Sequence, residues 1–100
     1  MTNSNYAKGS NFERAWIKEM AKQGYAGFRM AGSHTECDVI LFRDNPLMPY
    51  PALIFCQLKA YKRSRPKPSQ GFKDFNVPYP WAAKWWVTKK DREGPRVNAD

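Results

Sequence analysis

Two short apolar runs, separated by a proline-rich segment, most constrain what this chain can fold into. The first covers residues 37–42 and the second residues 53–59, and both are rich in β-branched and aromatic side chains. Runs of this length and composition, bounded by turn formers, are typical of buried strands. The prolines between them remove donors from a strand ladder, so residues 43–51 are expected to form a hairpin loop. The pattern predicts two adjacent strands.

Each apolar run carries polar side chains at one end. Asp38 opens the first predicted strand, and Gln57 and Lys59 close the second, two residues apart and therefore on one face. If the two strands pair as a hairpin, these ends meet. A carboxylate, an amide oxygen and an ammonium group would then converge beside a buried sheet, as metal-dependent phosphodiester chemistry requires.

An acidic residue that opens one strand, followed by a polar-x-Lys pattern that closes the next, resembles the signature of the PD-(D/E)XK nuclease superfamily. Further residues are similar to its archaeal-type Holliday junction resolvase branch. They are the run 8–14 (KGSNFER), Gly24-Tyr25, Arg29 and Ala31-Gly32-Ser33. The resemblance covers residues 7–64 well and the remainder loosely.

Two positions depart from the family pattern. The proline that usually precedes the aspartate is Cys37, which affects the backbone more than the chemistry. The second acidic ligand is Gln57, whose amide oxygen can bind a hard cation but brings no charge, so the affinity for magnesium should fall. Glu36 lies two residues before Asp38, on the same face if the strand begins early. It is a candidate to restore the missing carboxylate.

One hundred residues suffice for a single domain that buries about 65% of its unfolded surface. The resemblance implies an α/β domain with a restriction-endonuclease-like αβββαβ core, a mixed sheet and a short or irregular second helix. Apolar side chains at helical spacing predict the first helix over residues 10–23, ended by Gly24.

Residues 25–30 and 81–90 are predicted as the first and last strands, and residues 70–75 as one or two helical turns. The two ends of the chain, residues 1–9 and 91–100, are polar and are predicted to be flexible.

The net charge favours a polyanionic partner, because 17 Lys and Arg face 9 Asp and Glu, which gives +8. DNA is the first candidate. We expect the basic segment 60–74 to follow a phosphate backbone. The residues predicted to contact DNA are Lys8, Arg14, Arg29, Ser33, Lys62, Arg63, Arg65 and Lys67.

The sequence also bears on the cellular compartment. No run approaches the roughly 18 apolar residues of a membrane span, and the first ten residues lack the apolar region of a signal peptide. We therefore expect a cytoplasmic protein with no membrane partner.

The resemblance implies a divalent-metal-dependent endonuclease that cuts branched DNA such as four-way junctions, in recombination or repair. It also implies a homodimer, because two symmetric strands are cut. Asp38 would hold Mg²⁺ (or Mn²⁺), with Gln57 and the Leu58 carbonyl as weaker ligands. Glu13 would bind the metal directly or through water. Lys59 would orient the attacking water or stabilise charge on the phosphate.

Several alternatives stay open. Ser10-x-x-Glu13 has the form of a capping box, which gives Glu13 a structural role. His34 is either an exposed loop residue or a general base, and the tryptophans of residues 81–90 either pack in the core or stack on bases. The cysteines are expected to be reduced and buried, without a zinc site. Other functions are a catalytically weakened DNA-binding module of the same fold and a small basic RNA-binding protein.

Overall fold

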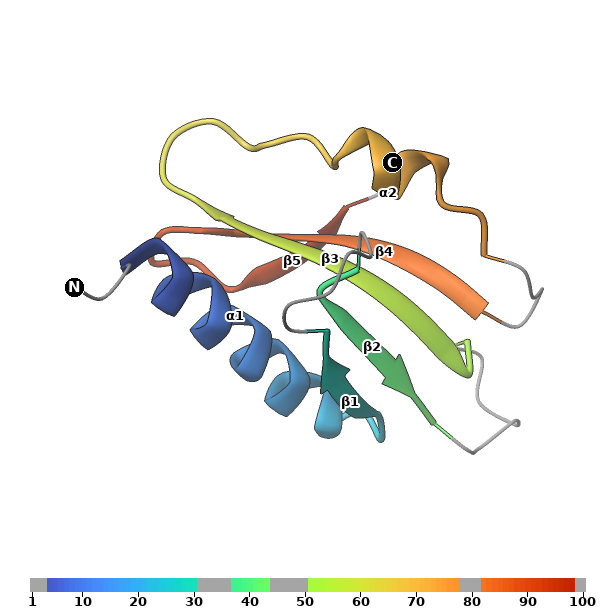
Figure 1. The fold of residues 1–100 in the computed structure, drawn as a ribbon. Helices are drawn as coiled ribbons and strands as arrows, with labels where there is room; N and C mark the ends of the chain where they lie inside the picture. Colours follow the sequence, from blue (N-terminus) through green and yellow to red (C-terminus); the bar gives the residue numbers. More distant parts are fainter. Residues whose placement is uncertain (1–3, 31–36, 44–50, 78–81, 99–100) are drawn as a thin grey trace.

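The computed structural model describes residues 4–30, 37–43, 51–77 and 82–98, and side chains from Asn11 onward. The elements in chain order are α1 (Ser4–Ala21), β1 (Ala26–Arg29), β2 (Val39–Phe42), β3 (Leu53–Tyr61), α2 (Gln70–Asp74), β4 (Ala82–Lys90) and β5 (Pro95–Asn98). The strands form one sheet in the order β1-β2-β3-β4-β5, with α1 lying along it (Figure 1). Only β3 and β4 pair in parallel, so the sheet is mixed and the α/β class is confirmed.

Helix α1 is held to the sheet by an apolar stripe. Phe12, Trp16 and Met20, spaced four residues apart, are all buried against the strands. The helix begins at Ser4, six residues earlier than predicted, so Ser10 lies inside it and cannot be the N-cap of a capping box. Residues 4–9, predicted to be flexible, are therefore helical. Once the buried stripe has nucleated a helix, each residue of its extension toward Ser4 adds one backbone hydrogen bond.

Two glycines set how α1 meets β1. Gly24 has φ +89°, and its N–H donates to the Ala21 carbonyl at 3.0 Å, so the chain turns at the predicted place. At Gly27 a Cβ atom would lie 2.8 Å from Leu41 Cδ2 and 3.1 Å from Ile17 Cγ1. The absence of a side chain at Gly27 lets α1 pack closely on the sheet.

The predicted hairpin is confirmed. Strands β2 and β3 pair antiparallel, with Val39 opposite Cys56 and Phe42 opposite Leu53. The prolines at positions 46 and 49 fall in residues 44–50, which lie outside the described residues. Strand β3 is two residues longer than predicted and occupies the centre of the sheet, where both of its faces carry apolar side chains.

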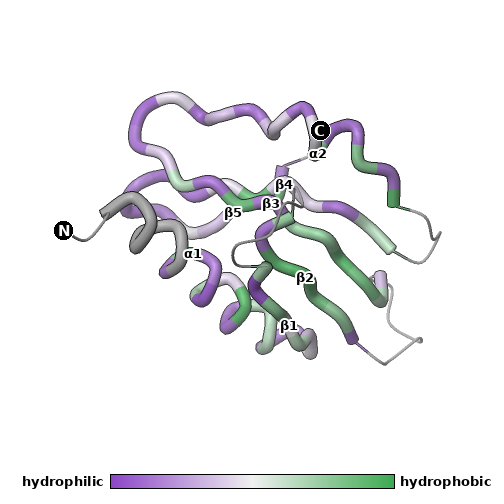
Figure 2. Tube along the Cα trace, viewed as in Figure 1, coloured by the Kyte–Doolittle hydropathy of each residue, from purple (hydrophilic) through white to green (hydrophobic). Residues whose placement is uncertain are grey.

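The two faces of the sheet have separate cores. Ile54, Cys56 and Leu58 of β3 pack toward α1 in the larger cluster. Phe55 alternates to the other face and joins the smaller cluster around Phe72 of α2. The short second helix is thus found where it was predicted. Figure 2 shows apolar residues concentrated in β2 and β3 and polar residues along the segment between β3 and α2.

The C-terminal region differs from the prediction. Residues 95–98, predicted to be frayed, form β5, which pairs antiparallel with β4. The turn between these strands contains Arg92 at φ 69° and a hydrogen bond of 2.9 Å from Glu93 N to the Lys90 carbonyl. The order in the described ranges is therefore αβββαββ rather than αβββαβ. In those same ranges, no helix has the length and hydropathy needed to cross a bilayer.

Candidate functional site

Hydrogen bonds from its backbone and from its side chain fix Asp38 at the start of β2. Its N–H donates to the Cys56 carbonyl at 2.8 Å, and its own carbonyl accepts from Met30 N at 2.9 Å. Its carboxylate oxygen Oδ2 accepts the Leu58 N–H at 2.8 Å, across the strand pair. The hairpin thus brings Asp38 beside the polar end of β3, as the sequence predicted.

Gln57 is buried and faces α2 rather than solvent. Its Nε2 donates to Ser69 Oγ at 2.9 Å, and its Oε1 accepts the Ser69 N–H at 3.0 Å. Ser69 is the N-cap of α2, where its Oγ also accepts the Phe72 N–H at 3.1 Å. The amide therefore anchors the helix while lying next to Asp38.

Lys59 lies on the same face of β3 as Gln57, two residues further along. The pairing of β2 with β3 begins at Val39 and Cys56, so β3 continues beyond the start of β2. At Lys59, β3 pairs with β4, where Thr88 is the partner. The Lys59 side chain is exposed and forms no ion pair with any described residue. Asp38, Gln57 and Lys59 thus come together along one face of the sheet.

Glu13 lies on the other face of the sheet, the face covered by α1, where it pairs with Arg29. Arg29 Nε donates to Glu13 Oε1 at 3.0 Å, and both side chains are about one-fifth exposed. Arg29 is in register with Val39, the residue after Asp38. The structure therefore joins two residues that the sequence had assigned to separate roles, in metal binding and in DNA binding.

Cys56 lies in the core beneath this site and is a free thiol, as is Cys37. Burial raises the pKa of the Cys56 thiol from 9.0 to about 12, and nearby Cys37 and Asp38 add to the rise. The Trp16 indole lowers this pKa, although its N–H reaches no hydrogen-bonding geometry with a described residue. Cys56 is consequently a neutral core side chain and not a nucleophile.

The predicted basic segment follows β3 directly. Its four candidates are all exposed, and in the part of the chain that the structure describes none of them pairs with a carboxylate: Lys62, Arg63, Arg65 and Lys67. Arg65 Nη1 donates to Asn98 Oδ1 at 2.9 Å. Arg14 is exposed on α1, whereas the Lys8 side chain, Ser33, His34 and Glu36 lie outside the described residues.

The candidate ligands match a divalent cation in the type of donor atom that they offer. Asp38, Glu13, Gln57 and the Leu58 carbonyl are all oxygen donors, the type that magnesium takes. Gln57 already bonds to the backbone and side chain of Ser69, and Glu13 to the side chain of Arg29; the described residues include no group of three His, Cys, Asp or Glu side chains that could hold a metal. The candidate ligands are of the type that binds a hard cation. Among those on the Gln57 face of the sheet, Asp38 is the one that brings a charge.

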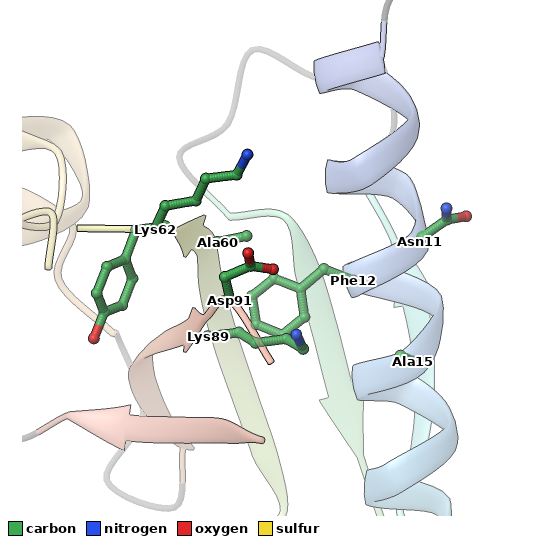
Figure 3. A pocket seen from close by; sticks show the side chains of 8 residues that line it. Asn11, Phe12, Ala15, Ala60, Lys62, Lys89 and Asp91 are labelled. Carbon is green, nitrogen blue, oxygen red and sulfur yellow. The ribbon is translucent and has the colours of Figure 1, made fainter. Parts of the chain in front are cut away.

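A separate pocket of about 650 Å³ opens on the α1 side of the sheet (Figure 3). Asn11, Phe12 and Ala15 of α1 form one wall. The other wall comes from the ends of β3 and β4, with Ala60, Tyr61, Lys62, Lys89 and Asp91. Since Ala60 alternates with Lys59 along β3, the sheet separates this pocket from the face that carries Gln57 and Lys59.

Sequence reasoning missed Arg96 and Asn98, which β5 adds beside the site. Asn98 is buried although polar, and Arg96 is exposed. The signal that could have revealed them is the turn-forming stretch at residues 91–94 between two runs of extended character, which is typical of a hairpin. Comparison with protein-family models, curated proteins and solved structures finds no match to this chain. Any family relationship therefore rests on the residues quoted above.

Proposed function

We propose that this protein is a divalent-metal-dependent endodeoxyribonuclease that acts on branched DNA, similar to Holliday junction resolvases. The observation that carries the proposal is the register of β2 and β3. It sets the Asp38 carboxylate 2.8 Å from the Leu58 N–H, beside Gln57, with Lys59 two residues further along the same face. This juxtaposition supports the proposal, with Gln57 in the place of the second acidic residue of the nuclease signature.

Each residue has a chemical role in this proposal. Asp38, Gln57 and the Leu58 carbonyl would hold the cation, and Glu13, which is paired with Arg29 on the α1 face, would bind it through water. A bound Mg²⁺ or Mn²⁺ would supply Lewis-acid assistance at the phosphate and acidify water. The Leu58 N–H holds the Asp38 carboxylate in one orientation, and Lys59 would stabilise negative charge that develops on the phosphate.

The charge distribution supports a DNA substrate. The net charge is +8, and the exposed cations after β3 begin three residues beyond Lys59. A phosphate backbone bound at Lys59 would be continued by contacts with Lys62, Arg63 and the residues that follow. The four-way junction and the homodimer remain proposals from the resemblance.

A second candidate is a DNA-binding module that keeps this fold without cleavage. This candidate is favoured by the hydrogen bonds that Gln57 and Glu13, the two weaker of the proposed metal ligands, already make. Both polar atoms of the Gln57 amide bond to Ser69, and Glu13 is paired with Arg29. In this candidate the basic segment binds DNA, and Gln57 serves to anchor α2.

Cleavage of a labelled four-way junction beside a linear duplex of the same sequence, with Mg²⁺ or Mn²⁺, separates the two candidates. We expect the wild type to cut the junction, Asp38→Asn to abolish cutting, and Gln57→Glu to improve it. Asp38→Asn is the matched control, because an asparagine oxygen can still accept the Leu58 N–H. Salt-dependent binding without cutting by the wild type would contradict the nuclease and favour the binding module.

A further inference from the structure

The face of the sheet that carries Lys59 continues across β4 to β5. Lys59 is in register with Thr88, and Thr88 is in register with Arg96. Adjacent strands lie about 4.8 Å apart, so the Cα atoms of Lys59 and Arg96 are separated by about 10 Å. Thr88 between them is buried, whereas Lys59 and Arg96 are exposed. Two cations therefore project from one cross-strand row.

Asn98 ties this row to the basic segment. The two N–H groups of its Nδ2 are shared among three acceptors, the Trp86 carbonyl at 3.1 Å, Thr88 Oγ1 at 2.9 Å and the Arg96 carbonyl at 3.2 Å. Its Oδ1 accepts Arg65 Nη1 at 2.9 Å. A single buried side chain thus bonds to β4, to β5 and to the guanidinium of Arg65.

The partner of Arg65 is neutral, which matters for its charge. An aspartate here would form an ion pair, but the Asn98 amide orients the guanidinium and leaves its positive charge uncompensated. Neither Arg65 nor Arg96 forms an ion pair with the residues described. A guanidinium held in one orientation retains N–H groups in a planar fork, the geometry that matches two oxygens of a phosphate.

We propose that Arg65 and Arg96, organised by Asn98, form a phosphate-binding site at the β4–β5 edge that takes the backbone of the DNA next to the strand held at Asp38 and Lys59. The proposal rests on the proposed function, since the ligand is the DNA substrate. Arg65 and Arg96 contact phosphates directly, and Asn98 is a positioning residue that acts through Arg65.

The test is equilibrium binding of a labelled four-way junction in EDTA, so that cleavage is absent, over a series of salt concentrations. We expect Arg65→Gln and Arg96→Gln each to weaken binding several-fold. Each should also reduce the slope of log K against log salt by about one, the value for one lost phosphate contact. The matched control is Lys18→Gln, which removes one exposed charge from α1 and should leave the slope within error of the wild type.

Asn98→Ser tests the positioning role. We expect it to weaken DNA binding clearly more in the wild-type background than in the Arg65→Gln background, because the part of its effect that passes through Arg65 is absent from the second background. A purely structural role would instead give equal losses in both backgrounds, with the same fall in melting temperature. Equal losses would overturn the positioning role of Asn98.

The outcomes also separate this inference from the nuclease proposal. If the wild type binds the junction but Arg65→Gln and Arg96→Gln behave like Lys18→Gln, the phosphate-binding site is contradicted. The nuclease proposal is then decided by the cleavage assay alone. If the slopes fall as expected while the wild type does not cut, the phosphate-binding site is supported and the nuclease is contradicted. A wild type that does not bind DNA overturns both.

Discussion

Gln57 and Ser69 are joined by two hydrogen bonds in opposite directions, at 2.9 Å from the Gln57 amide nitrogen and at 3.0 Å to its oxygen. Gln57, which the resemblance proposed above aligns with the second acidic position of the nuclease signature, therefore also anchors the start of α2. This pair explains how a glutamine can be structurally favourable at a position where the resembled family carries a charge. It also makes the exchange to glutamate an informative experiment.

Gln57→Glu is expected to retain the fold and to strengthen metal-dependent cutting. A glutamate can accept the Ser69 N–H and the proton of its hydroxyl, and it adds a negative charge beside Asp38. We expect half-maximal cutting at a magnesium concentration about tenfold lower than for the wild type, which corresponds to about 1.4 kcal/mol. The measurement is the magnesium dependence of junction cleavage. An unchanged or higher magnesium requirement would argue against Gln57 as a ligand.

Gln57→Leu provides the complementary test of the structural role. The substitution removes both hydrogen bonds between residue 57 and Ser69 in a partly buried position, so we expect a loss of about 1–3 kcal/mol in the free energy of unfolding. Urea denaturation measures it. A stability equal to that of the wild type would show that the two bonds contribute little.

Lys84 is expected to stabilise α2 through its charge. Its Nζ donates to the carbonyls of Phe72, Lys73 and Phe75 at the C-terminal end of that helix. Lys84→Met keeps the aliphatic stem but removes these bonds, and we expect it to lower the free energy of unfolding by about 1.5–3 kcal/mol. The control is Lys90→Met on the same strand, which is exposed and should change stability by less than about 0.5 kcal/mol. Equal effects of the two substitutions would contradict the role of Lys84.

Val87 and Val97 face each other across β4 and β5 but differ in burial. Val87 is completely buried in the cluster under α1, whereas Val97 is 44% exposed. Val87→Ala is expected to cost about 1.5–3 kcal/mol of stability through lost burial and a residual cavity, and Val97→Ala about 0.5 kcal/mol or less. Chemical denaturation of the two variants compares them directly. A reversed order would contradict the arrangement of this edge.

Alkaline pH is expected to destabilise the protein through Cys56. The thiol pKa is raised from 9.0 to about 12 in the folded state, so the folded state keeps a proton that the unfolded state loses above pH 9. The stabilisation is complete below pH 9 and is lost progressively between pH 9 and pH 12, at up to about 1.4 kcal/mol per pH unit. Cys56→Ala should show a shallower fall in unfolding free energy between pH 8 and pH 10. Parallel pH profiles would contradict the burial of the thiol.

The sequence predicted the elements whose signals are local. The hairpin of β2 and β3 followed from two apolar runs and their prolines, and its pairing brought Asp38 to β3 as expected. Helix α1 followed from its apolar stripe, but its start at Ser4 did not, because the residues before the stripe carry no periodic signal. The four residues of β5 include Pro95 and become a strand only by pairing with β4. Composition at that end of the chain indicates a polar terminus, and the turn-forming stretch at residues 91–94 is its local signal of a hairpin.

The side-chain partners in the site were less predictable. Ser69 meets Gln57 from twelve positions away, and Arg65 meets Asn98 from thirty-three. Each bond depends on where the chain returns after β3, and no spacing rule relates the partners. The ion pair of Glu13 with Arg29 likewise depends on how α1 crosses the sheet.

The parallel pairing of β3 with β4 implies an order in which the protein folds. Strands β1, β2 and β3 are neighbours both in the chain and in the sheet, so their contacts close short loops. Strand β4 pairs with β3 only after the long connection that contains α2. Loop-closure entropy delays such pairings. The backbone around Asp38 should therefore be formed in the folding transition state before β4 and β5 dock. Substitutions in the β2–β3 hairpin should accordingly slow folding, and Val87→Ala should mainly speed unfolding.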